Sequence, residues 1–273
     1  MPLEILSPAG SFESMTAAVR AGADAVYFGA GGFNARRNAK NFGDDELAAA
    51  MRYCRLRGVK TYVTVNTLVT DRELQQAKAL VARLNQLGAD ALIVQDLGMV
   101  RMMRALAPDL PLHGSTQMTV HSLGGVLAAH KLGLERVVLS RELPLEEIRF
   151  ICERSPIEIE VFCHGALCMC YSGQCFLSAA IGGRSGNRGL CAQPCRMNYS
   201  FFGAAPSPLL SLKDLSAAGH LRELEQAGVR CLKIEGRMKR PEYVALATKT
   251  YKDAVREGRE PTGEETERLR AVF

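Results

Sequence analysis

The sequence predicts a (β/α)8 barrel, an α/β fold in which parallel strands alternate with helices. Short apolar runs rich in β-branched residues alternate with segments of helical periodicity along the whole chain, which is typical of parallel strands joined by crossover helices. A weak internal repeat accompanies this alternation. The chain has 273 residues, and such barrels commonly occupy about 250 residues as one domain. We therefore expect residues 1–273 to form a single domain.

Each predicted strand is a short apolar run bounded by glycine, proline or polar residues. The first such run is LEILS and the last is CLKIE. The eight predicted strands cover residues 3–7, 25–30, 60–66, 91–96, 110–116, 136–141, 157–163 and 231–235.

A glycine precedes five of these strands at a nearly constant distance, as in AGADAVYFG, LGADALIVQ and AGVRCLKIE. Glycine tolerates the left-handed conformation that ends a helix, so the repeating unit is helix, glycine, strand. A doubly wound open sheet is the alternative, but no glycine-rich phosphate loop stands in the right context to support it. The predicted helix-ending residues are Gly22, Gly58, Gly88, Gly133 and Gly228.

Composition and charge favour a cytoplasmic protein. No secretory leader follows Met1, and no apolar run approaches the roughly 20 residues that span a bilayer, so we expect no membrane segment. The net charge of +5 is compatible with RNA or an anionic substrate, but it is below that of a dedicated nucleic-acid module. Nine cysteines, an odd number in a chain without a leader, indicate metal binding or thiol chemistry rather than disulfides.

The regular alternation is interrupted once, by a cysteine-rich and glycine-rich insertion at residues 164–205, after the seventh strand. Long irregular loops inside a domain are usually functional, and barrels bind substrates at this end of their strands. The insertion carries the pattern C-x6-C-x15-C-x3-C, formed by Cys168, Cys175, Cys191 and Cys195.

Four thiolates on one loop predict a metal centre, because thiolate is a soft ligand that suits zinc or an iron-sulfur cluster. Structural zinc prefers closely spaced pairs, and only the second pair fits that habit, so the spacing leans towards a cluster. Cys54, Cys152, Cys163 and Cys231 fall on predicted helices or strands, where a buried free thiol is the ordinary interpretation. Cys170 and Cys231 are reserve ligands.

The motifs HGALC, YSGQC, GRSGNRG-x-C-x3-CR and KIEGR resemble those of the collagenase-like peptidases, peptidase family U32. EILSPAG, GADAVYFG, VTVNTLV, ADALIVQD, STQM and VVLSREL also fit, so the resemblance covers nearly the whole chain. Despite the family's label, the resemblance implies an iron-sulfur protein of oxygen-independent hydroxylation. Different branches act on a cytidine of ribosomal RNA, on the wobble uridine of transfer RNA, or in ubiquinone synthesis.

SGQC, GRSGNRG and CR resemble most closely the ribosomal RNA branch, and for both RNA branches the resemblance implies prephenate as hydroxyl donor. The resemblance also implies that the four cysteines hold a four-iron four-sulfur cluster, with zinc as an occupant after aerobic purification. Two features depart from the family. Cys163 and Cys170 stand where other residues are expected, and RNA-modifying relatives continue into further C-terminal domains after the KIEGR region, where this chain stops.

Polar residues at the predicted strand ends suggest a site at the barrel mouth, although each of them could instead satisfy a loop backbone. Arg141 and Arg237 are candidates for binding a carboxylate, because guanidinium pairs with it in bidentate fashion. Glu235 should share a strand face with Arg237 and Lys233, and either hold Arg237 or act as a general base. His164 is an acid or base near the cluster, or a hydrogen-bonding partner of a ligand sulfur. The full set is Asn66, Gln95, Asp96, His113, Ser115, Gln117, Arg141, His164, Glu235 and Arg237.

Two other classes of function stay open. A peptidase has little local support, because the sequence lacks H-E-x-x-H and G-x-S-x-G, and Cys163 and His164 should point to opposite faces of a strand. A non-catalytic protein that uses the metal only to hold its loop together is the other class, since four cysteines can close a zinc site completely.

Overall fold

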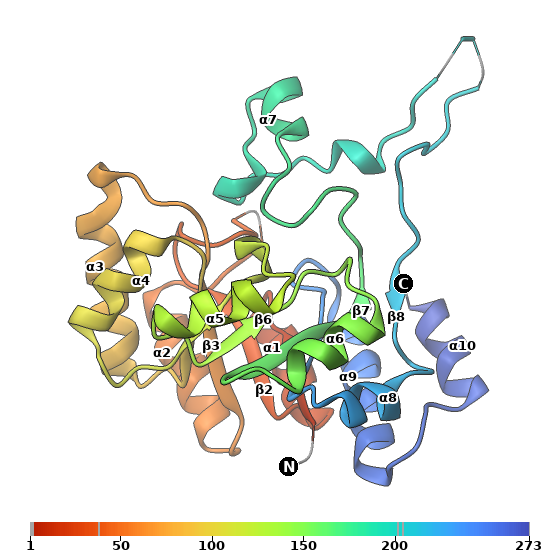
Figure 1. The fold of residues 1–273 in the computed structure, drawn as a ribbon, viewed down its shortest axis with the longest axis horizontal. Coiled ribbons are helices and arrows are strands. Elements are labelled where there is room, and N and C mark those ends of the chain that lie inside the picture. The colour runs from red at the N-terminus through yellow and green to blue at the C-terminus, as the bar shows by residue number, and fades with distance from the viewer. Residues whose placement is uncertain (1–2, 38, 201, 204, 273) are drawn as a thin grey trace.

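The chain folds into a closed barrel of eight parallel strands surrounded by helices (Figure 1). The computed structural model describes residues 3–37, 39–200, 202–203 and 205–272. The barrel strands are β1 (Glu4–Pro8), β2 (Ala25–Gly29), β3 (Lys60–Val65), β4 (Ala91–Val94), β5 (Leu112–Gly114), β6 (Arg136–Val138), β7 (Glu158–Gly165) and β9 (Cys231–Ile234). They pair in the order β6-β5-β4-β3-β2-β1-β9-β7, and β7 pairs with β6 to close the ring. The predicted barrel class is therefore confirmed.

The helices cover the outside of the barrel (Figure 1). All five predicted helix-ending glycines have positive φ, from 68° at Gly58 to 96° at Gly228, as the repeat of helix, glycine and strand requires. The helices are α1 (Phe12–Arg20), α2 (Asp44–Arg55), α3 (Leu74–Leu87), α4 (Leu97–Leu106), α5 (Leu123–Lys131), α6 (Leu145–Cys152), α8 (Leu221–Ala227), α9 (Pro241–Glu257) and α10 (Gly263–Ala271), with short 3-10 turns η1 (Asp71–Glu73) and η2 (Thr116–Met118). Among these described helices, none combines the length and apolar character needed to cross a bilayer.

The barrel interior contains both an apolar cluster and buried ion pairs. Its middle is filled by a small buried cluster that includes Leu6, Tyr27 and Ile93, while the larger apolar core lies between the strands and the helices. At the N-terminal end Arg136 bonds Glu4 at 2.6 Å, and inside the barrel Lys233 bonds the fully buried Glu160 at 2.8 Å. Because these buried charges are paired, the barrel can keep ionised groups inside it.

An irregular segment, residues 166–213, leaves β7 and lies at the C-terminal ends of the strands (Figure 1). We call it the cap. It contains α7 (Leu177–Gly182) and the turns η3 (Gly186–Arg188) and η4 (Pro194–Arg196), and the chain then returns as β8 (Leu215–Ser216), antiparallel to β7. The predicted insertion of residues 164–205 begins two residues inside β7, because that strand continues to Gly165.

Candidate active site

A small polar pocket lies inside the barrel at its C-terminal end. This inner pocket has a volume of about 30 Å³ and is lined by cations, which are Arg36, Arg141, Lys233 and Arg237, and by the single carboxylate Glu235. It brings together six of the predicted site residues from the ends of four different strands: Asn66, Ser115, Gln117, Arg141, Glu235 and Arg237. Since barrels place their chemistry at this end, these residues are the natural candidates for it.

Glu235 binds two of these arginines. One carboxylate oxygen lies 3.1 Å from Arg36 Nη2, and the other lies 3.9 Å from Arg141 Nη2. Burial alone would raise the pKa of Glu235, but the neighbouring arginines, Arg36 first, hold it at about 2. Glu235 is therefore ionised at neutral pH and a poor general base. The prediction that Glu235 holds Arg237 is wrong, because among the described residues its ion pairs join it to Arg36 and Arg141 instead.

The guanidinium groups of Arg141 and Arg237 have unused donors. Arg237 Nη1 donates to Thr64 Oγ1 at 2.9 Å and to Asn34 Oδ1 at 3.3 Å, while Arg141 Nη1 donates to the Ala166 carbonyl at 3.1 Å. Within the described part of the chain, neither buried Nε atom finds an acceptor. Burial lowers the pKa of Arg237 only to about 10, so it stays charged at neutral pH. Two buried cations with unpartnered N–H groups have the chemistry that an anion site requires.

A second pocket of about 140 Å³ lies directly above the first, between the barrel and the cap. The structure brings all four predicted cysteine ligands to the wall of this outer pocket: Cys168, Cys175, Cys191 and Cys195. Cys168 and Cys191 are exposed, and the other two are half-buried. Burial and the neighbouring thiols of Cys168 and Cys191 raise the pKa of Cys195, so these three thiols lie near one another although they are spread over 28 positions of the sequence.

The inner and outer pockets share a wall. Ala35, Arg36, Gln117 and Arg141 line both of them. The inner pocket by itself has room for about one water molecule, and a larger ligand held by its arginines could extend past this wall towards the cysteines.

Of the reserve ligands, Cys170 neighbours Cys175 and Cys168 but does not line the pocket. Cys231 is fully buried inside the barrel next to Glu160 and Arg136. Cys163 is also fully buried and donates to the Lys233 carbonyl at 3.5 Å. Cys163 and Cys231 are therefore remote from the cap.

His164 is not part of the mouth. It lies within β7, and its ring packs against α9, with Nδ1 3.2 Å from the Tyr251 hydroxyl and the ring stacked on Tyr243 at 5.9 Å. Simple alternation would place it on the same face as Phe162, which lines the inner pocket. A register shift between Phe162 and His164 re-aims the side chain, as bulges do, so the expected position of His164 beside the cluster is corrected.

Three other predicted residues have different surroundings. Asp96 caps α4 by accepting from the Met99 amide at 3.0 Å, which is a structural role. His113 packs edge-on against Tyr62 at 4.8 Å in the barrel interior. Gln95 is buried and lines neither mouth pocket.

Arg36 is the site residue that sequence reasoning missed. It belongs to the loop AGGFNARRN after β2, whose glycines and asparagines give no clear periodicity. Its place in the loop that follows a barrel strand could have indicated a site residue, because the loops at the C-terminal ends of barrel strands converge on the mouth.

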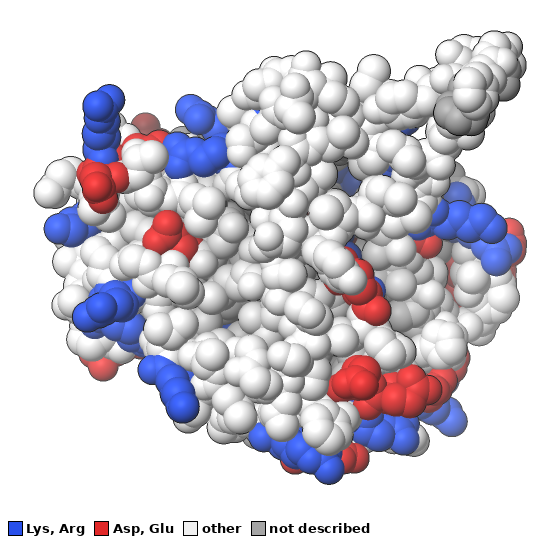
Figure 2. Space-filling view, turned by 45° about the horizontal axis from the view of Figure 1, so that its top comes forward, with Lys and Arg blue, Asp and Glu red and all other residues white. Residues whose placement is uncertain are grey.

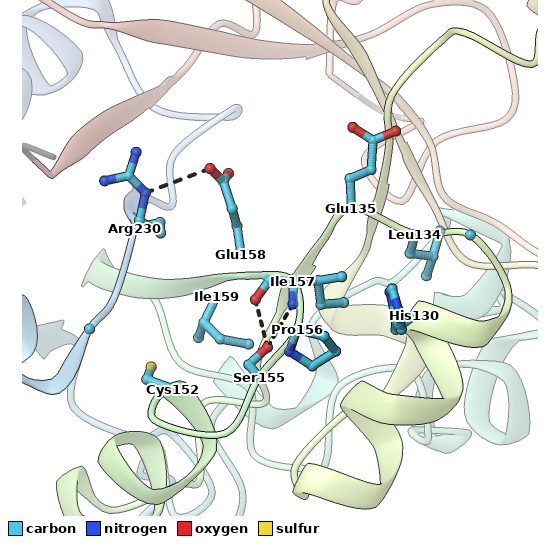
Figure 3. Close-up of a pocket in the computed structure, with 12 residues that line it drawn as sticks. His130, Leu134, Glu135, Cys152, Ser155, Pro156, Ile157, Glu158, Ile159 and Arg230 are labelled. Carbon is cyan, nitrogen blue, oxygen red and sulfur yellow. Dashed lines mark hydrogen bonds and ion pairs between the residues drawn. The ribbon is translucent and has the colours of Figure 1, made fainter.

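A wider hollow of about 550 Å³ lies at the opposite, N-terminal end of β6, β7 and β9 (Figure 3). His130, Glu135 and Cys152 point towards it, and Glu158 is paired with Arg230 at 3.6 Å. It contains none of the predicted site residues, and this end of a barrel usually serves stability.

The fold and the two pockets define a class of protein: a β/α barrel with an arginine-lined mouth beneath a cap whose four cysteines line one pocket. The chain belongs to peptidase family U32, which it matches over residues 10–272. It is 42% identical over 266 residues to the 23S rRNA 5-hydroxycytidine C2501 synthase of Escherichia coli, a match that covers 94% of this chain and 40% of that protein.

Two further relatives carry different names. The chain is 38% identical to a collagenase of Porphyromonas gingivalis, covering 92% of this chain and 65% of that one. It is 36% identical to tRNA hydroxylation protein P1 of Bacillus subtilis, covering 92% and 63%. The chain thus spans between two fifths and two thirds of the length of these relatives.

Solved structures support the fold. A U32 peptidase superposes with a TM-score of 0.61 at 14% identity, covering 86% of this chain and 93% of that one. Thiamine phosphate pyrophosphorylase from Pyrococcus furiosus gives 0.54 at 16% identity, covering 93% and 96%.

Proposed function

We propose that this chain supports oxygen-independent hydroxylation of an RNA base, with a four-iron four-sulfur cluster at the cap and prephenate as hydroxyl donor. The names of its relatives support RNA as substrate, and the higher identity to the 23S rRNA synthase than to the tRNA hydroxylation protein favours a ribosomal cytidine over a wobble uridine. One observation carries the proposal. An arginine-lined pocket and a four-cysteine pocket share a wall, which would bring a carboxylate donor next to the metal centre.

The cysteine set fits a cluster better than one zinc ion. Within residues 3–37, 39–200, 202–203 and 205–272, no three His, Cys, Asp or Glu side chains converge closely enough to hold a single metal ion. A four-iron cluster binds each thiolate through a different iron, so it accepts a wider set of sulfurs around a pocket. When bound, such a cluster supplies one-electron redox chemistry at the mouth.

The arginines would hold the donor. Prephenate carries two carboxylates, and the unpartnered Nε–H groups of Arg141 and Arg237 are suited to donate charge-assisted hydrogen bonds to them. Glu235 would orient Arg36 and Arg141 rather than move a proton, because its pKa is far below neutrality.

The geometry gives little support to a hydrolase. Among the described residues that line the two mouth pockets there is no histidine, and a thiol or hydroxyl nucleophile needs a neighbouring base. Burial raises the pKa of Cys54 to about 12, which keeps that thiol protonated and unreactive. The P. gingivalis relative's name therefore does not decide the activity of this chain.

The test begins with iron, acid-labile sulfide and zinc analysis of protein purified without oxygen. About four irons per chain should be found, and prephenate with RNA lacking the modification should then give a hydroxylated nucleoside, detected by mass spectrometry. Stoichiometric zinc without sulfide, or cluster-loaded protein that never hydroxylates RNA, would contradict the proposal. Release of peptides from collagen in the same preparation would favour the hydrolase.

A further inference from the structure

The cap contains no acidic residue. Residues 166–213 include Arg184, Arg188, Arg196 and Lys213 but neither Asp nor Glu, although 29 of the chain's 273 residues are acidic. At that frequency a segment of 48 residues would contain about five. The loop at residues 30–43, which meets the cap, likewise carries only cations. A surface from which negative charge is excluded is suited to a polyanion.

The same surface exposes aromatic and aliphatic side chains. Tyr171, Phe176 and Ile181 are 56%, 66% and 65% exposed, and Tyr171 stacks on His121 with the ring centres 6.1 Å apart. In Figure 2 the described residues of the part of the cap that projects from the barrel show no red. Exposed rings on an apolar surface provide platforms on which unpaired bases can stack.

Arg37 and Arg184 are the arginines of this surface that are available to a partner. Two others, Arg188 and Arg196, are already paired with Glu73 and Asp214. By contrast, no carboxylate among the described residues lies within ion-pairing distance of the exposed Arg37 or Arg184.

Arg37 and Arg184 flank one short segment of the cap. The Arg37 amide donates to the Gly189 carbonyl at 3.2 Å, and Arg184 Nε donates to the Leu190 carbonyl at 3.0 Å. Cys191, which follows this segment, lines the outer pocket. The two cations are therefore held at the edge of the proposed metal centre.

We propose that the cap is the docking surface for single-stranded RNA, with Arg37 and Arg184 contacting phosphates and Phe176 and Tyr171 stacking bases beside the outer pocket. This inference rests on the proposed function and specifies how its substrate is held. Apolar exposure alone would also suit a protein partner. The exclusion of acids and the two available arginines favour RNA, because phosphate contacts dominate nucleic-acid affinity.

The experiment measures binding of a fluorescent single-stranded RNA of about 16 nucleotides to cluster-loaded protein by anisotropy, over a series of salt concentrations. The double variant Arg37→Gln, Arg184→Gln should lower the slope of log K against log salt by about 1.4, or about 0.7 for each phosphate contact. Phe176→Ala should weaken binding about fivefold or more, the lower limit for a stacked base. Matched controls are Arg20→Gln on α1 and Phe150→Ala on α6, both exposed and outside the cap.

Normal RNA binding by the cap variants, or equal losses in the controls, would overturn the docking surface and leave the hydroxylation proposal standing. Cap-dependent RNA binding by protein that contains no cluster and hydroxylates nothing would support the surface and contradict the function. Absence of salt-dependent RNA binding in the unmodified protein would overturn both. If Phe176→Ala instead abolishes self-association in light scattering while RNA binding is unchanged, the surface joins copies of the chain and the RNA inference is wrong.

Discussion

Replacing Glu235 by glutamine should destabilise the fold, because it leaves buried arginines without their counter-charge. The side chain of Glu235 is 13% exposed, and that of its partner Arg141 is 8% exposed. The pKa of Glu235 is lowered from 4.5 to about 2, a difference that corresponds to about 3 kcal/mol of folding free energy at pH 7. Loss of one partner from a buried ion pair costs a similar amount, about 3–5 kcal/mol.

The effect should depend on pH with a definite sign. The pKa of Glu235 is depressed in the folded state, so its contribution is complete above the unfolded value near 4.5 and is lost as pH falls towards about 2. At pH 7 the variant should melt about 6–12 °C below the unmodified protein. The difference should narrow at pH 4 and continue to narrow at pH 3.

Thermal melts followed by circular dichroism at pH 7, 4 and 3 provide the measurement. Glu225→Gln, which removes an exposed carboxylate from α8, is the control and should melt normally at each pH. Equal stability of Glu235→Gln and the unmodified protein at pH 7 would refute the assignment of Glu235 as the anchor of the arginines. A deficit that does not change with pH would refute its electrostatic origin.

Three further predictions concern the ligand, the metal and the cap. Arg237→Gln should weaken prephenate binding about tenfold or more, the cost of one charged hydrogen bond, in calorimetry; unchanged affinity would remove Arg237 from the anion site. The Cys191→Ala variant should lose iron and sulfide, while the Cys54→Ala variant, which removes a buried thiol, should keep both. Equal metal content in the two variants would contradict the ligand set. Gly189→Ala should reduce both thermal stability and iron retention, because φ is +75° and the new Cβ would lie 2.2 Å from the Asn34 carbonyl oxygen. Gly183→Ala, with φ +66° and open space around it, should cost only about 1 kcal/mol, so equal losses in the two glycine variants would exclude the clash as the cause.

The barrel could be predicted because its local signals agree with one another. Each predicted strand overlaps one observed strand, and each proposed helix-ending glycine has the left-handed conformation. The antiparallel β8 was missed, since two residues, Leu215–Ser216, give no periodicity. Its pairing with β7 depends on where the chain returns from the cap, and this is a long-range property.

The site could be predicted only where strand ends determine the direction of side chains. Arg141, Glu235 and Arg237 converge as expected. His164 does not, because a one-residue bulge in β7 reverses its orientation and no sequence signal marks the bulge. The role of Glu235 could not be predicted from the sequence either, since its partner Arg36 lies 199 positions away.

The wall shared by the two pockets has a consequence for the kinetics of the proposed reaction. If a donor held by Arg237 enters through the cysteine-lined pocket that adjoins its site, an RNA lying on the cap would cover that same entrance. Substrates would then bind in a compulsory order, with the small acid first and the polynucleotide second. Excess RNA would act as a competitive inhibitor of the small acid, and the spent donor could leave only after the modified strand had dissociated.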